Sequence, residues 1–94
     1  MTNMQEWHNQ LMQLMADAHA IEETPDFQNG VVAGWHEGAI SLVLMSYKLQ
    51  KPMTEEQLRQ KTGDKHSADW LKGFIAGYFL RLKKAEEVKY VDPE

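Results

Sequence analysis

Residues 24–35 read TPDFQNGVVAGW, and residues 67–78, which begin 43 positions later, read SADWLKGFIAGY. Both stretches follow one pattern: a hydroxyl residue, a small residue, aspartate, an aromatic residue, two variable positions, glycine, two large apolar residues, alanine, glycine and an aromatic residue. A hydroxyl residue followed two positions later by aspartate is typical of a helix N-terminus, because both groups satisfy or face its free N–H groups. The repeat therefore predicts the starts of two similar helices.

The segment before the first copy predicts an amphipathic helix over residues 3–22. Its apolar residues recur at helical intervals and form one stripe: Met4, Trp7, Leu11, Leu14, Ala18 and Ile21. Thr24 is then the expected N-cap of a second helix over residues 25–49, with Pro25 at its first position. We expect this helix to stop before Pro52, because a residue that precedes proline avoids the helical conformation.

The second half of the chain predicts a short helix and a long one. Thr54 and Gln57 have the spacing of a capping box for a helix over residues 54–62, which Gly63 closes. Ser67 is the expected cap of the last helix. No segment alternates with the period of a strand, so we predict an all-α fold in one domain, residues 1–94. It would consist of two pseudo-symmetric helical hairpins, residues 1–50 and 51–94.

Five glycines fall inside the second and fourth predicted helices: Gly30, Gly34, Gly38, Gly73 and Gly77. A glycine inside a helix is less stable than an alanine by about 0.5–1 kcal/mol, so closer packing has to compensate. Their spacing of four places them on one side of each helix, where small residues let two backbones approach. We therefore expect these two helices to cross closely at their glycine strips, related by a pseudo-two-fold axis.

The G-x-x-x-G spacing also occurs in transmembrane helix dimers. In this chain His36 and Glu37 interrupt the apolar run of the second helix, and Lys72 and Arg81 lie within the last one. Neither helix offers the roughly 20 apolar residues of a membrane span. We expect no contact with a membrane.

Composition sets the class of protein. The 94 residues are 43% hydrophobic and 26% charged, which is typical of an ordinary globular domain. The absence of cysteine excludes disulfides, thiolate metal sites and cysteine nucleophiles. The N-terminus has neither a basic nor an apolar segment of the kind a secretion signal needs, so we expect a cytoplasmic protein.

Charge is divided unevenly along the chain. The first 47 residues hold six acidic residues and no lysine or arginine, whereas the remaining 47 hold ten basic and eight acidic residues. The net charges are therefore −6 and +2, which together give the −4 of the whole chain. The asymmetry predicts either halves with different partners or complementary halves that meet each other, and an ordinary solvated surface is the third interpretation.

The repeat also identifies candidate partner-binding residues. After the first copy the chain continues His36-Glu37, whereas after the second it continues Phe79-Leu80. A carboxylate beside the small-residue strip would receive a partner's cation, or it would simply mark a solvent edge. With the other acidic residues of this half, the candidate site for a basic partner comprises Glu22, Glu23, Asp26, His36 and Glu37.

No pattern indicates catalysis or a cofactor. His19 and Glu22 have the i, i+3 spacing of a metal-binding pair and His8 lies on the same predicted face, but a third close ligand is missing. The chain contains no G-x-S-x-G, P-loop, H-E-x-x-H or zinc-ribbon spacing. We predict no enzyme, no metal site and no cofactor.

The basic half suggests an alternative function, which is binding of nucleic acid or the ribosome. Its candidate residues are Lys61, Lys65, Lys72, Arg81, Lys83 and Lys84, with aromatic residues among them. Residues 30–34, GVVAG, and 70–74, WLKGF, resemble the G-x-x-A-G and W-L-x-G-W segments of ribosome modulation factor and its small relatives. The resemblance covers about ten residues and implies ribosome or RNA association, without assigning RNA-contacting residues.

The leading hypothesis follows from the apolar character of the two central helices. The second helix is apolar nearly all round, with Val32, Ile40, Val43 and Tyr47 well away from the flank that holds Val31, Trp35, Leu42 and Met45. Such helices leave apolar surface for a second chain, and a homodimer is the most economical way to cover it. We therefore predict a regulatory or inhibitory protein that binds another protein as a homodimer, of the kind bacteria, phages and mobile elements encode.

Overall fold

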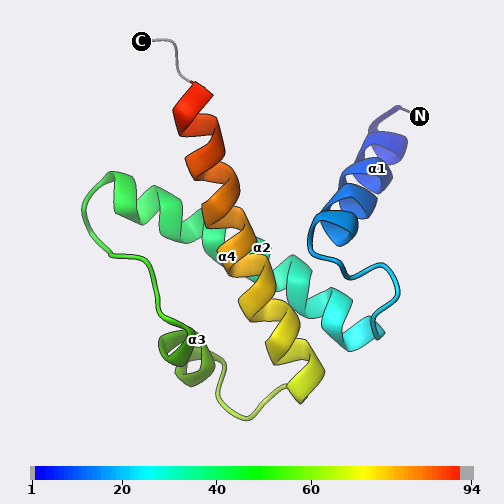
Figure 1. The fold of residues 1–94 in the computed structure, drawn as a ribbon. Helices are drawn as coiled ribbons and strands as arrows, with labels where there is room; N and C mark the ends of the chain where they lie inside the picture. Colours follow the sequence, from blue (N-terminus) through cyan, green and yellow to red (C-terminus); the bar gives the residue numbers. More distant parts are fainter. Residues whose placement is uncertain (1, 92–94) are drawn as a thin grey trace.

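The computed structural model describes residues 2–91, which form four helices and no strand. The helices are α1 (Thr2–Asp17), α2 (Pro25–Ser46), α3 (Glu55–Thr62) and α4 (Ala68–Val91). The predicted all-α class is therefore confirmed for this part of the chain. Figure 1 shows α2 and α4 crossing at the centre, with α1 and α3 on different outer sides of the crossing.

The starts of the last three helices are fixed by side-chain caps. The Thr24 hydroxyl accepts a hydrogen bond from the Phe27 N–H (3.2 Å) at the start of α2. The Ser67 hydroxyl accepts one from the Trp70 N–H (3.1 Å) at the start of α4. Thr54 forms a complete capping box for α3. Each cap satisfies N–H groups that have no partner within the helix, so these starts agree with the sequence.

Helix α1 ends at Asp17, so the predicted end at residue 22 is wrong. His19 has a positive φ of 56°, and the Ala20 N–H donates across the turn to the Met15 carbonyl (2.7 Å). This is a Schellman motif, whose left-handed position is usually glycine. Ala20 is fully buried in a cluster with Met15. The turn forms here because it buries Ala20.

Helix α2 ends in the same way, at Ser46 and not at residue 49. Lys48 takes the left-handed conformation, with φ 61°, and the Leu49 N–H donates to the Leu44 carbonyl (2.9 Å). An L-residue in this conformation is less stable than glycine by about 1–2 kcal/mol. A lysine or a histidine at the closing position gives no sequence signal for a helix end, which explains both errors.

The backbones of α2 and α4 are in direct contact at four glycines. A Cβ atom on Gly34 would overlap the Phe74 carbonyl oxygen, and one on Gly77 would overlap the Val31 carbonyl oxygen. Gly30 and Gly73 face the carbonyls of Trp70 and Phe27 in the same way. At Gly38 the nearest atom is the Arg81 Cβ, at 2.7 Å from such a Cβ. No residue larger than glycine fits this crossing without moving a helix.

Two small cores lie on either side of the crossing. In the first, Met15 of α1 and Val31 of α2 are buried together with Ala20. In the second, Leu58 of α3 is buried with Phe74 and Tyr78 of α4. Each outer helix therefore covers one central helix with one deeply placed side chain. Of the stripe predicted for the first helix, Leu11, Leu14 and Ala18 pack against the first core, whereas Met4, Trp7 and Ile21 are exposed and the buried residue is Met15.

A buried hydroxyl ties the α2–α3 connection to the second core. The Tyr78 hydroxyl accepts a hydrogen bond from the Met53 N–H (2.9 Å) and donates one to the Ser41 hydroxyl (3.0 Å). Ser41 is fully buried and also accepts a bond from the Gln50 side chain (3.1 Å). These bonds satisfy polar groups that would otherwise be buried without partners.

Candidate protein-binding surface

The N-termini of α2 and α4 exchange hydrogen bonds. Thr24, the cap of α2, donates its hydroxyl hydrogen to the Asp69 carboxylate in the first turn of α4 (3.1 Å). Ser67, the cap of α4, donates to the Asp26 carboxylate in the first turn of α2 (2.8 Å). The hydroxyl and the aspartate of each copy of the repeat thus act across the pair of helices, a role that sequence reasoning missed although both copies carry the same two groups.

Asp26 differs from the other acidic candidates in the exposed connection, because its carboxylate is hydrogen-bonded within the chain. Its carboxylate accepts the Ser67 hydrogen bond and faces the positive end of α2. Glu22 and Glu23 lie in the exposed connection between α1 and α2, because α1 ends at Asp17 and not at residue 22 as the sequence predicts. His19 lies in the turn after α1, so it does not share a helix face with His8.

His36 and Glu37 point to different surroundings although they are adjacent. Glu37 forms an ion pair with Lys61 of α3 (3.6 Å), and its side chain is only 17% exposed. His36 is exposed and lines a hollow between α1 and α2. Glu37 thus joins the two halves of the chain, whereas His36 remains at a surface that a partner can reach.

An apolar groove of about 600 Å³ lies between α1 and α2. Its lining includes Met12 and Met15 of α1, Ile21 of the connection and Val32 of α2, together with Trp7, Leu11, Gln28, Asn29, Ala33 and His36. A second hollow, of about 470 Å³, also lies between α1 and α2, and Trp7, Leu14 and Trp35 are among its lining residues. Helix α1 thus covers α2 incompletely and leaves apolar side chains accessible beside it.

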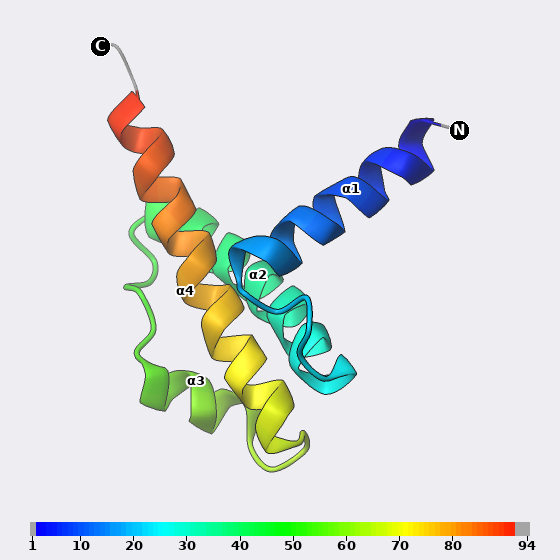
Figure 2. The same cartoon turned by 45° about the vertical axis from the view of Figure 1, so that its right-hand side comes forward.

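The N-terminal part of α1 and the C-terminal part of α2 expose further apolar side chains. Met4 and Trp7 are 71% and 61% exposed, and Figure 2 shows this end of α1 running away from the other helices. On α2, Ile40, Val43 and Tyr47 are 54%, 57% and 69% exposed. Large apolar patches on a small protein mark interaction sites, since exposure of such side chains to water is unfavourable.

Three of the six basic candidates for nucleic-acid binding contact the first half of the chain. Lys61 pairs with Glu37, and the Arg81 guanidinium lies over the Trp35 ring at 5.2 Å from its centre. Lys84 pairs with Asp17 (3.4 Å). The structure thus favours the interpretation that the acidic and basic halves meet each other. The other three candidates, Lys65, Lys72 and Lys83, are exposed.

The contacts of Asp17 change its titration. A hydrogen bond from the Gln13 side chain (2.9 Å), and after it the Lys84 ammonium, hold the pKa of Asp17 below its ordinary value. Both partners favour the ionised carboxylate, and they exceed the opposing effect of desolvation. Asp17 therefore links the last turn of α1 to α4.

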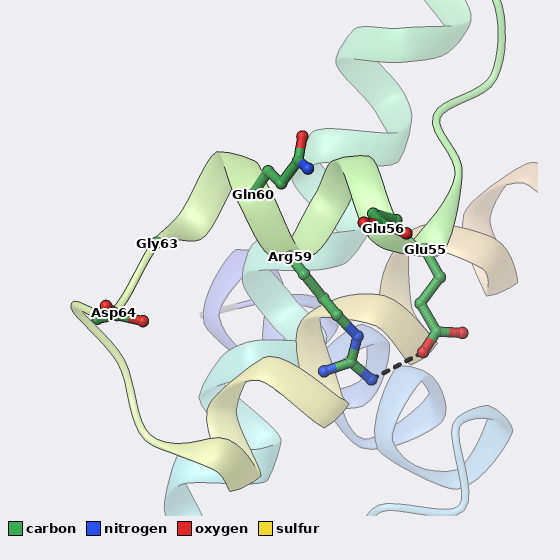
Figure 3. A pocket seen from close by; sticks show the side chains of 6 residues that line it. All are labelled: Glu55, Glu56, Arg59, Gln60, Gly63 and Asp64. Atoms are coloured by element: carbon green, nitrogen blue, oxygen red, sulfur yellow. Dashed lines mark hydrogen bonds and ion pairs between the residues drawn. The ribbon is translucent and has the colours of Figure 1, made fainter.

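A polar hollow of about 610 Å³ lies along α3, at the opposite side of the molecule from α1 (Figures 1 and 3). It is lined by Glu55, Glu56, Arg59, Gln60, Gly63 and Asp64. Arg59 and Glu55 form an ion pair across one helical turn (2.7 Å), as Figure 3 shows. The side chain of Arg59 is 50% exposed and that of Glu55 is 57% exposed. Exposed pairs of this kind are typical of a solvated helix face.

Among the described residues no group of histidine and acidic side chains is arranged to hold a metal ion.

Comparisons of the chain with protein-family models, curated proteins and solved structures find no match. The short resemblance to ribosome modulation factor therefore has no family match to support it. Over residues 2–91, no helix combines the length and the apolar character that a membrane crossing requires.

Proposed function

We propose that this chain is a small, non-enzymatic regulatory or inhibitory protein that acts by binding another protein, and that it does so as a homodimer. The observation that carries this proposal is the open apolar groove between α1 and α2. A hollow lined by methionine, leucine and valine side chains suits the apolar face of a partner's helix, which inserts side chains spaced by one turn. Methionines let the same surface adapt to its partner.

The partner would carry basic residues beside its apolar face. Glu22 and Glu23 are exposed in the connection between Ile21 and Gln28, both of which line the groove. Acidic side chains at the rim attract a basic partner and select against acidic ones, although they add little to the affinity at physiological salt. The lack of cysteine suits the proposed setting in a reducing cytoplasm, where the gene would belong to a bacterium, phage or mobile element.

We further propose that the scaffold of this surface is a pair of pseudo-symmetric hairpins. A shift of 43 residues relates Gly34 to Gly77, and each of them faces a carbonyl of the other helix. The same shift relates the two caps, Thr24 and Ser67, which exchange their bonds. It also relates Met15 to Leu58 and Val31 to Phe74, the buried residues of the two cores. These reciprocal contacts support close crossing at glycine strips about a pseudo-two-fold axis.

Affinity capture from the native host tests the proposed binding. The wild-type chain should retain a specific protein, whereas the double variant Met12→Glu/Ile21→Glu should lose it, because both substitutions place charge in the groove. Phe79→His is the matched control, since Phe79 is an exposed apolar residue on α4, away from the groove. Capture that survives both groove substitutions would contradict this site.

A salt titration separates the nucleic-acid alternative from protein binding. Binding of RNA or DNA through Lys65, Lys72 and Lys83 would weaken steeply with salt, because each neutralised phosphate releases counterions. We expect no submicromolar binding to either nucleic acid. Such binding, with a steep dependence on salt, would replace the proposal.

A further inference from the structure

The two outer helices differ in length although they bury equivalent residues. Helix α3 has 8 residues and α1 has 16. A shift of 43 residues places Met15 on Leu58, and it places Met12 on Glu55, the first residue of α3. Residues 2–11 of α1 therefore have no helical counterpart in the second half, where the shorter helix is enough to cover α4. We call residues 2–11 the arm.

The arm carries apolar side chains that the chain itself does not cover, although Leu11 at its end packs against the first core. Met4 and Trp7 are more than half exposed, and this part of α1 points away from the central helices (Figure 2). A tryptophan has a large apolar area, so an exposed tryptophan contributes none of the stabilisation that its burial by a partner would give. The arm is therefore longer than the hairpin requires and adds little apolar burial in an isolated monomer.

The exposed part of α2 departs from its counterpart in the opposite half. Ile40 and Val43 are exposed on α2, and the residues 43 positions later on α4 are Lys83 and Glu86, both exposed. The second half thus carries charge at the two positions equivalent to Ile40 and Val43, whereas the position equivalent to Tyr47 is again a tyrosine, Tyr90. We call the patch formed by Ile40, Val43, Tyr47 and Leu49 the distal face. Its apolar character has no function in the packing of α2 on α4.

We propose that the arm of one chain packs on the distal face of a second copy, and that a two-fold axis repeats this contact. This inference rests on the proposed homodimeric function and specifies its interface. A two-fold dimer forms the arm-to-face contact twice, so that both unpartnered surfaces of each chain are covered at once.

Charge favours the same arrangement. Helix α1 contains no lysine or arginine, and Glu6 is exposed in the arm between Met4 and Trp7. Lys48 and Lys51 are exposed at the end of the distal face. The arm of a second copy would therefore bring an acidic side chain to a basic border, which complements the apolar contact.

The exposed apolar side chains supply most of the area that a dimer needs. Met4, Trp7, Ile40, Val43, Tyr47 and Leu49 are each more than half exposed. At about 100 Å² for each of them, the arm and the distal face offer on the order of 600 Å² of side-chain surface per chain. A standard stable interface buries about 800 Å² per partner, a total that neighbouring polar atoms would complete.

Sedimentation equilibrium between about 1 and 100 μM, a range that brackets micromolar association, tests the interface. The wild-type chain should reach twice its 10.9 kDa monomer mass. The variant Ile40→Lys/Val43→Glu carries the residues of the equivalent positions on α4, and we expect it to dimerise at least about 100-fold more weakly. Circular dichroism should show unchanged helix content, since both side chains are exposed. Phe79→His places on α4 the residue of the equivalent position on α2, His36. This control should leave the dimer intact.

The arm is tested separately. Trp7→Ala should weaken dimerisation about as much as the distal-face variant, since the two surfaces form one contact. Glu6→Lys should weaken it several-fold, and Lys48→Glu/Lys51→Glu in the same chain should restore it, because a swapped pair attracts again. A fully dimeric Trp7→Ala or Ile40→Lys/Val43→Glu variant would overturn the interface while leaving a homodimer in place. A wild-type chain that stays monomeric over the whole range would overturn the homodimer itself.

Discussion

Within residues 2–91, two residues other than glycine hold backbone conformations that suit glycine better. His19 and Lys48 close Schellman motifs at the ends of α1 and α2 with φ of 56° and 61°. Ala20, which follows His19, is buried, whereas Leu49, which follows Lys48, is exposed. The turn after α1 is thus held by burial as well as by its hydrogen bonds, and the turn after α2 relies on the hydrogen bonds.

Lys48→Gly should stabilise the monomer by about 1 kcal/mol, because glycine adopts a positive φ without the strain that a Cβ atom introduces. Urea unfolding at low protein concentration measures the change. Lys51→Gly is the matched control, since Lys51 is a nearby exposed lysine with no positive φ. An unchanged or lower stability for Lys48→Gly would mean that the closing turn does not set the end of α2.

Asp17 predicts a defined dependence of stability on pH. Its pKa is lowered in the folded chain, so its contribution is present above the unfolded value of about 3.9 and is lost as the pH falls through the folded value. Asp17→Asn should therefore be less stable than wild type at pH 7, and the difference should disappear once the pH lies below the lowered pKa of Asp17. Urea unfolding measures the difference, and Glu23→Gln, in the exposed connection, is the control for the loss of one acidic charge.

At the scale of helices, the α2–α4 crossing depends on the absence of side chains. Four glycines bring backbone against backbone, and their helical propensity is lower than that of any residue except proline. Dispersion between closely packed backbones compensates for this loss. The polar contacts at the helix starts then fix the relative position of the two N-termini.

Gly34→Ala should lower the free energy of unfolding by about 1–3 kcal/mol, although alanine is the better helix former, because its Cβ would overlap the Phe74 carbonyl. Gly38→Ala meets the Arg81 side chain rather than a carbonyl at its nearest point, so it should be milder. Urea unfolding of both variants tests this order. A higher stability for Gly34→Ala would contradict the close crossing, because it would mean that α2 and α4 leave room for a Cβ atom at this position.

The exchanged caps predict energetic coupling between α2 and α4. Thr24→Ala should lower the free energy of unfolding by about 1 kcal/mol through the loss of its own cap. Its bond to Asp69 should appear as a coupling of about 0.5 kcal/mol in a double-mutant cycle with Asp69→Ala. The same cycle between Thr54 and Asp69, in which Thr54 caps only α3, should give no coupling.

At the scale of the whole molecule, charged side chains connect the two halves of the chain, whereas exposed apolar side chains lie mainly in the first half. The pairs Glu37–Lys61 and Asp17–Lys84 join an acidic first half to a basic second half. The unpartnered apolar residues are concentrated in the first half, at the groove, the arm and the distal face. The second half serves mainly as a scaffold in the function that we propose.

If two copies associate, stability should depend on protein concentration. The Tm of wild type should rise by a few degrees for each tenfold increase in concentration, because association favours the folded state by mass action. The Tm of the variant Ile40→Lys/Val43→Glu should not depend on concentration. Differential scanning calorimetry at several concentrations makes the comparison, and a constant Tm for wild type would contradict a dimer that is coupled to folding.

The sequence by itself determined the all-α class and the starts of α2, α3 and α4. Caps and apolar periodicity act between residues three or four positions apart, so their signals lie within short segments. It also predicted that Val32, Ile40, Val43 and Tyr47 lie away from the flank of Val31. The last three are exposed, whereas Val32 packs against the same core as Val31.

Only the tertiary structure decided where α1 and α2 end, that the caps act across two helices, and that Glu37 pairs with Lys61. It also decided which candidate site residues contact other parts of the chain and which lie at the open groove. His36 is the candidate that lines the groove. These features depend on burial and on contacts between residues far apart in the sequence, such as Asp17 with Lys84. Their free energies arise only when the helices meet, so no local pattern records them.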